Sequence, residues 1–186
     1  MLTELQTEKM THYFNILDFD NNGKIEKDDF QAIGENLNIL WGYKEGTEKH
    51  DKIMNKFGES WQHFRERVDY DEFNTATLDE WLSFADEHII NGSEEFFEMY
   101  IRDITRDIFN NFDNNGDGFI SLDEYIDFFM AYRIEIRYSA KSYTKLDLNS
   151  DDLLSRDEML SAVEEFFRSD NKDAPGNWLF GFWGSR

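Results

Sequence analysis

The sequence has no cysteine, one proline and no long apolar run. The absence of cysteine excludes a disulfide framework and a thiol nucleophile. No stretch approaches the roughly 20 apolar residues that a membrane-spanning helix needs. Basic residues are also scarce, because 19 Lys and Arg stand against 40 Asp and Glu, and the formal net charge is -21. Phosphate backbones and anionic membranes repel such a chain, so we expect no nucleic-acid partner.

Signals for export and for catalysis are also missing. Residues 1–5 are polar and acidic, and Leu2 stands where N-myristoylation requires glycine. We therefore expect a cytoplasmic protein. The sequence contains no glycine-rich phosphate loop and no pair of histidines at helical spacing. We expect no enzymatic activity.

Apolar and aromatic residues are plentiful. Of the 186 residues, 40% are hydrophobic and 18 are Phe, which is enough for a dense core. The length indicates one compact unit or two small units that pack closely.

The most specific motif covers residues 113–124, here called loop three, and matches the twelve-residue EF-hand calcium loop. Ca²⁺ is a hard cation that takes six to eight oxygen ligands, and this loop supplies them at positions 1, 3, 5, 7, 9 and 12. Gly118 at position 6 allows the sharp turn. The ligand positions hold Asp113, Asn115, Asp117, Phe119 (through its backbone carbonyl), Ser121 and Glu124.

The motif recurs at residues 18–29 (loop one) and 147–158 (loop four). Loop one presents Asp18, Asp20, Asn22, Lys24, Glu26 and Asp29 at the ligand positions. Loop four presents Asp147, Asn149, Asp151, Leu153, Ser155 and Glu158. Loop four carries Asp152 where glycine is expected, so we predict a strained left-handed residue there. We predict three Ca²⁺ sites, one in each of these loops.

Residues 69–80 form a degenerate copy, loop two. Phe73 stands at position 5 and offers no side-chain oxygen, so we expect this loop to bind no metal. Position 8, where paired loops meet in a short β-bridge, holds Ile25, Ala76, Ile120 and Leu154 in the four loops.

These repeats predict an all-α fold of four helix–loop–helix units in two packed pairs, with short β-bridges between paired loops. We expect an amino-terminal pair at residues 1–91 and a carboxy-terminal pair at residues 92–169. The segment 170–186 contains a cluster of aromatic residues that is too apolar for water, so we expect this tail to dock on the body. Thr3 and Ser93 are predicted helix caps.

The pattern of three complete loops, a degenerate second loop and an apolar tail resembles the invertebrate sarcoplasmic calcium-binding proteins and the related calexcitins. The most specific segments are residues 18–30, in which Asp closes the loop, and residues 176–181, Gly-Asn-Trp-Leu-Phe-Gly. The resemblance implies a compact cytosolic fold that buffers Ca²⁺ and often Mg²⁺. It also implies that the ligand positions of the three complete loops are the metal ligands.

Three functions stay open. A buffer is favoured, because sensors expose Met-rich grooves and this chain has 6 Met against 18 Phe. A sensor with a protein target is the alternative, although the sequence indicates no particular target. An apolar-ligand carrier related to the photoproteins is the third reading. Because Asp29 is one methylene shorter than Glu, we expect loop one to be the loop most tolerant of Mg²⁺. We expect a monomer.

Overall fold

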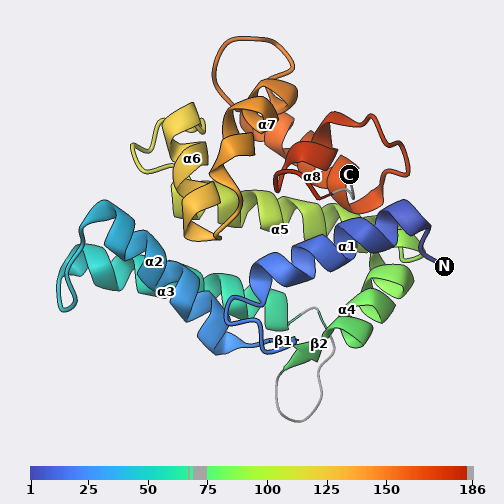
Figure 1. Ribbon diagram of the computed structural model, residues 1–186, viewed down its shortest axis with the longest axis horizontal. Helices are drawn as coiled ribbons and strands as arrows, with labels where there is room; N and C mark the ends of the chain where they lie inside the picture. Colours follow the sequence, from blue (N-terminus) through green and yellow to red (C-terminus); the bar gives the residue numbers. More distant parts are fainter. Residues whose placement is uncertain (67, 69–74, 184–186) are drawn as a thin grey trace.

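The computed structural model describes residues 1–66, 68 and 75–183, and the all-α prediction is confirmed for them (Figure 1). The helices are α1 (Glu4–Leu17), α2 (Lys27–Trp41), α3 (Glu48–Arg65), α4 (Leu78–Phe84), α5 (Glu94–Phe112), α6 (Leu122–Ala131), α7 (Ser139–Leu146) and α8 (Arg156–Arg168). A π-helical turn, η1 (Ala85–Ile90), extends α4, and two 3₁₀ turns are η2 (Ile136–Tyr138) and η3 (Pro175–Trp178). Two short strands, β1 (Lys24–Ile25) and β2 (Ala76–Thr77), complete the fold.

The loops pair as predicted. Ile25 of β1 is antiparallel to Ala76 of β2, which joins loop one to the second half of loop two. Ile120 and Leu154 form an isolated antiparallel bridge between loops three and four. Each pair of helix–loop–helix units is therefore tied at its loops, while the apolar faces of the helices turn inward.

Local sequence sets the helix ends. Thr3 caps α1 in a capping box with Gln6, and Ser93 accepts a hydrogen bond from the Phe96 amide at the start of α5. Gly42 ends α2 in the left-handed conformation that glycine adopts at low cost. The predicted caps are confirmed.

The buried core is one continuous cluster that includes residues of every helix from α1 to α8. In Figure 1, α5 crosses the middle of the molecule, and α2 and α3 run side by side. Helices of the first half pack on the second half, with α1 on α8, α2 on α6, α3 on α5, and η1 on both α5 and α8. The helices that flank the loops therefore share one core, which links the two halves.

The part of the tail that follows η3 packs against helices of both halves. Leu179 and Phe180 are buried, and the Phe180 ring centroid lies 4.7 Å from that of Phe166 and 5.0 Å from that of Tyr13. Phe182, by contrast, is 39% exposed. The buried residues Ala174, Asn177, Leu179 and Phe180 therefore anchor the tail, whereas its end is more exposed.

Candidate metal centres

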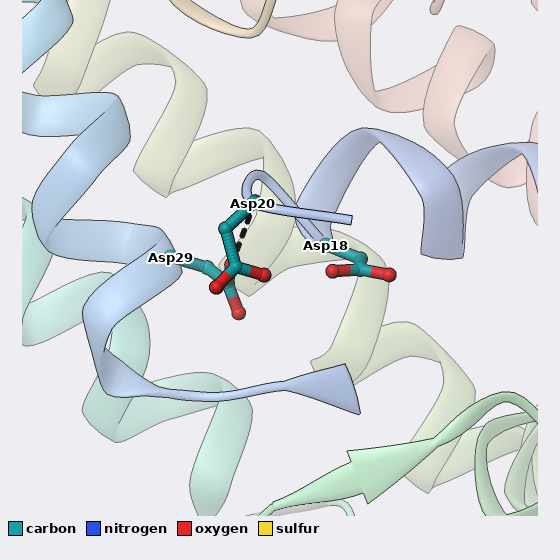
Figure 2. A group of neighbouring side chains, drawn as sticks. All are labelled: Asp18, Asp20 and Asp29. Carbon is teal, nitrogen blue, oxygen red and sulfur yellow. Dashed lines mark hydrogen bonds between the residues drawn. The ribbon is translucent and has the colours of Figure 1, made fainter. Parts of the chain in front are cut away.

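Loop one gathers three carboxylates between the end of α1 and the start of α2 (Figure 2). Asp18, Asp20 and Asp29 each place one oxygen within 4.8 Å of the others. A Ca²⁺ ion bonded at about 2.4 Å to two oxygens would hold them at most about 4.8 Å apart. The spacing and the hard oxygen chemistry of these residues therefore fit such an ion.

The aspartate at position 1 is oriented by backbone amides in all three complete loops. In loop one, Asp18 accepts from the amides of Asn22 and Gly23, both at 2.9 Å. In loop three, the position 6 amide of Gly118 donates to Asp113 at 3.0 Å. In loop four, the position 6 amide of Asp152 donates to Asp147, also at 3.0 Å. These bonds restrict where each carboxylate can point.

The carboxylate at position 12 is also held alike in the three loops. One oxygen accepts from the amide of position 2: Phe19 to Asp29 at 2.9 Å, Asn114 to Glu124 at 2.9 Å, and Leu148 to Glu158 at 3.0 Å. The other oxygen accepts from the amide of position 9: Glu26 to Asp29 at 2.8 Å, Ser121 to Glu124 at 2.9 Å, and Ser155 to Glu158 at 2.9 Å. The shorter Asp29 thus reaches the same two amides.

Positions 9 and 12 serve the exiting helices as well. Ser121 and Glu124 form the capping box that starts α6, and Ser155 and Glu158 form the one that starts α8. Glu26 and Asp29 stand in the same relation at the start of α2. The residues predicted as ligands therefore also fix the direction of the helix that follows.

The remaining predicted ligands lie at the rim of their loops. In loops three and four the position 3 amide group donates to the position 5 carboxylate, Asn115 to Asp117 at 2.8 Å and Asn149 to Asp151 at 3.0 Å. In loop one, Asn22 donates from its side chain to Asp20 at 3.0 Å. The residues of position 7, which offer backbone carbonyls, are Lys24, Phe119 and Leu153.

Asp152 has the predicted left-handed backbone, with φ of 64°. The glycines at the same position in loops one and three, Gly23 and Gly118, both have φ of 86°. Asp tolerates this conformation better than most residues, at a cost on the order of 1 kcal/mol. The turn of loop four therefore forms in spite of the missing glycine.

Loop two is described only in its second half. The prediction that Phe73 makes it unable to bind metal falls on residues 69–74, which lie outside the described residues. Thr77 and Glu80 form the capping box of α4, as the equivalent residues do in loops three and four. This half therefore keeps its architectural role.

Asp29 and Glu158, both at position 12, differ in the direction in which their pKa is shifted. Burial raises the pKa of Asp29 from 3.8 to about 6, although hydrogen bonds from the backbone of Glu26, Asp20 and Phe19 oppose the rise. At Glu158, burial also pushes the pKa upward, but hydrogen bonds from Ser155 and its neighbours outweigh it and leave the pKa below its ordinary value. A proton therefore competes with a metal ion more strongly in loop one than in loop four.

A cavity of about 60 Å³ lies between the two halves. At its edge, Nδ1 of His63 lies 3.1 Å from a carboxylate oxygen of Asp107. The lining residues are mostly aromatic: Tyr13, Phe30, Phe64, Tyr100, Phe128, Tyr132 and Phe180. The high aromatic content of the chain was only a general hint of this space, because the lining comes from five separate helices and the tail.

Two segments match models of the EF hand, residues 11–33 ("EF hand") and residues 104–132 ("EF hand domain"). The chain therefore contains EF-hand domains at these two segments. Calerythrin from Saccharopolyspora erythraea is a relative that is 24% identical over 166 residues, which is 89% of this chain and 94% of calerythrin. Sarcoplasmic calcium-binding protein 1 from Astacus leptodactylus is 27% identical over 112 residues, which is 58% of this chain and 57% of that protein.

Among solved structures, the coelenterazine-binding protein from Renilla muelleri, in its Ca²⁺-loaded apo form, aligns with a TM-score of 0.80. It is 19% identical, and the alignment covers 97% of this chain and 99% of that one. This likeness shows the fold. Together, the motifs and the homologues support a calcium-binding EF-hand protein of the sarcoplasmic and calerythrin type. In the described part of the chain, no helix is long and apolar enough to cross a membrane.

Proposed function

We propose that this protein is a cytoplasmic, monomeric Ca²⁺ buffer that binds three Ca²⁺ ions through loops one, three and four. The ligands are those at positions 1, 3, 5, 7, 9 and 12 of each loop. Repeated amide support for positions 1 and 12 favours three sites of one design. Bound Ca²⁺ would neutralise part of the net charge of -21, so binding and folding support each other.

The observation that favours a buffer over a sensor is the packing of the tail. A sensor opens its helices and exposes an apolar groove to a target. Here Phe180 inserts among aromatic rings of both halves, and the hydroxyl of Tyr125 donates to the backbone oxygen of Leu179 at 2.7 Å. A segment of the chain itself therefore occupies the surface that a target would need.

Calorimetric titration with Ca²⁺, with and without millimolar Mg²⁺, tests the stoichiometry. We expect three ions per chain, and a fourth ion bound between residues 69 and 80 would contradict this. A second experiment distinguishes a buffer from a sensor with a dye that binds exposed apolar surface. A buffer should show equal dye binding with and without Ca²⁺, whereas a sensor should bind dye mainly in its Ca²⁺ form and capture a target only then.

A second candidate function is the carriage of an apolar ligand, which the central cavity favours. Its aromatic lining with the His63–Asp107 pair at the edge would suit a ring system with a polar group. The related fold of the coelenterazine-binding protein is compatible with this reading. The cavity of about 60 Å³ is, however, smaller than the roughly 150 Å³ space that accommodates benzene in an engineered core. An absorbance spectrum of the purified protein beyond the range of Trp and Tyr would reveal such a ligand.

A further inference from the structure

Arg133, in the segment between α6 and η2, lies on loop one. Its guanidinium carbon is 3.6 Å from the centroid of the Phe19 ring. Its Nη1 atom donates to the backbone oxygen of Phe19 at 3.2 Å. Phe19 separates the ligand positions Asp18 and Asp20, and its own amide donates to Asp29 at 2.9 Å. Arg133 thus holds Phe19 through its ring and its backbone oxygen, while the amide of Phe19 supports the carboxylate of Asp29.

The backbone of Arg133 adopts a conformation that glycine would take more easily. Its φ is 55°, in the left-handed region. Arg133 directly follows Tyr132, the C-cap of α6; its amide donates to the backbone oxygen of Met130, and the amide of Ile134 donates to that of Phe129. Helices commonly end this way with glycine. An arginine here incurs strain that its backbone role does not require, which points to a role for the side chain.

Loops three and four have no such arrangement at position 2. Leu148 is 58% exposed and Asn114 is exposed, whereas Phe19 is 8% exposed beneath the guanidinium. All three residues donate the same amide bond to position 12. Among the three complete loops, only loop one therefore has its position 2 side chain covered by a guanidinium group.

The segment that carries Arg133 is fixed to the first helix–loop–helix unit by a second set of contacts. The side chain of Asn36, on α2, donates to the terminal carbonyls of Met130 and Ala131, both at 3.0 Å. Trp41, also on α2, donates to Asp127 of α6 at 2.7 Å. Because α6 is the exiting helix of loop three, its end is connected both to loop one and to the exiting helix of loop one.

We propose that Arg133 is a positioning residue for metal binding in loop one, through which α6 sets the affinity of that loop. The inference rests on the proposed Ca²⁺ binding by loop one. With Phe19 fixed, Asp18, Asp20 and Asp29 lose less conformational freedom when an ion binds, so affinity rises. If α6 moves when loop three binds Ca²⁺, the two loops are coupled, and the coupling is reciprocal.

The test follows each loop through the amide resonance of its position 6 residue, Gly23, Gly118 or Asp152, during a Ca²⁺ titration by NMR. Arg133→Gly removes the side chain and suits the left-handed backbone, and Arg133→Lys keeps the charge without the planar group. Arg137→Ala is the control, because Arg137 pairs with Glu135 and stacks on Tyr138 in the same segment.

We expect Arg133→Gly to weaken loop one about tenfold, the size of a lost cation–π contact with its hydrogen bond, and to leave loop four within about twofold. Arg133→Lys should also weaken loop one, because an ammonium group does not stack as a guanidinium does. Arg137→Ala should change no loop. In Arg133→Gly without Ca²⁺, the Phe19 amide should exchange with solvent faster than in the parent.

The coupling between loops one and three is measured in a double-mutant cycle that combines Arg133→Gly with Glu124→Gln, a change that disables loop three. That change should weaken loop one in the parent and have a smaller effect in Arg133→Gly, where only the Asn36 and Trp41 contacts still link α6 to α2. The proposal is overturned if Arg133→Gly leaves loop one unchanged or tightens it, if it weakens all three loops equally, or if the Phe19 amide exchanges at the parent rate. A parent Gly23 resonance that ignores Ca²⁺ while Gly118 responds would instead refute Ca²⁺ binding by loop one, and the inference with it.

Discussion

The ammonium group of Lys9 donates to the side-chain oxygen of Asn177 at 3.2 Å. It also donates to the backbone oxygens of Glu165 and Ser169, at 3.1 and 2.6 Å. These three acceptors match the three N–H groups of an ammonium ion. Lys9 is fully buried, so this group joins α1, the end of α8 and the start of the tail away from water.

Lys9→Met should lower the free energy of unfolding by about 3 kcal/mol, because it keeps the apolar stem but removes three hydrogen bonds and leaves the buried side-chain oxygen of Asn177 without this donor. Chemical denaturation at saturating Ca²⁺ measures the change. Lys172→Ala is the control, since Lys172 is exposed and should stay within about 0.5 kcal/mol of the parent. Equal stability of the two variants would show that the buried hydrogen bonds of Lys9 are not needed.

Phe180→Ala should cost about 3–5 kcal/mol, as expected for the loss of a buried aromatic side chain. Phe180 is 3% exposed and its ring packs against those of Phe166, Tyr13 and Phe128. Phe182→Ala, a change of the same size at a residue that is 39% exposed, should cost less than about 1 kcal/mol. Thermal unfolding of both variants decides whether the tail is part of the core. Similar melting temperatures would contradict its packing role.

Asp29→Glu should shift loop one toward Ca²⁺ and weaken competition by Mg²⁺. The longer side chain can give both oxygens to a larger ion, whereas six short bonds suit Mg²⁺. The reciprocal change, Glu124→Asp, should make loop three more tolerant of Mg²⁺. Calorimetric Ca²⁺ titrations with and without Mg²⁺ compare the two variants. If neither changes the Mg²⁺ competition, position 12 does not set the selectivity.

The affinity of loop one should fall when the pH drops below about 6. Burial raises the pKa of Asp29 to about 6, so Ca²⁺ must displace a proton from it at lower pH. We expect a loss of about tenfold per pH unit there, with one proton released per ion. Loop four should hold its affinity to lower pH, because hydrogen bonds outweigh burial at Glu158 and lower its pKa. Titrations at pH 7.5 and 5.5, read at Gly23 and Asp152, test the difference.

The same shift acts on the protein without bound metal, with the opposite sign. The folded state prefers Asp29 protonated, so this group adds stability that is complete below its unfolded pKa of 3.8. That contribution is lost as the pH rises through about 6. Asp29→Asn should remove this dependence in Ca²⁺-free denaturation. A pH profile identical to that of the parent would show that Asp29 is not its source.

The spacing of residues in the sequence was sufficient to predict the loops and the helices that flank them. The alternation of oxygen-bearing residues, the glycine at position 6 and the apolar residue at position 8 act within twelve residues, and the amide of Asn114 accordingly donates to Glu124 within loop three. The capping boxes are equally local, since Ser121 and Glu124 lie three residues apart. Local hydrogen bonding therefore explains why the helix–loop–helix pattern could be read from the chain.

The sequence by itself determined the all-α fold, loops one, three and four, and the pairing of the loops, because each depends on contacts between near neighbours or on a repeated motif. Only the tertiary structure decided which residues support those loops from outside. Arg133 and Phe19 are separated by 114 residues, and Lys9 and Asn177 by 168. No periodicity links such pairs, since they meet only where α1, α6, α8 and the tail pack together.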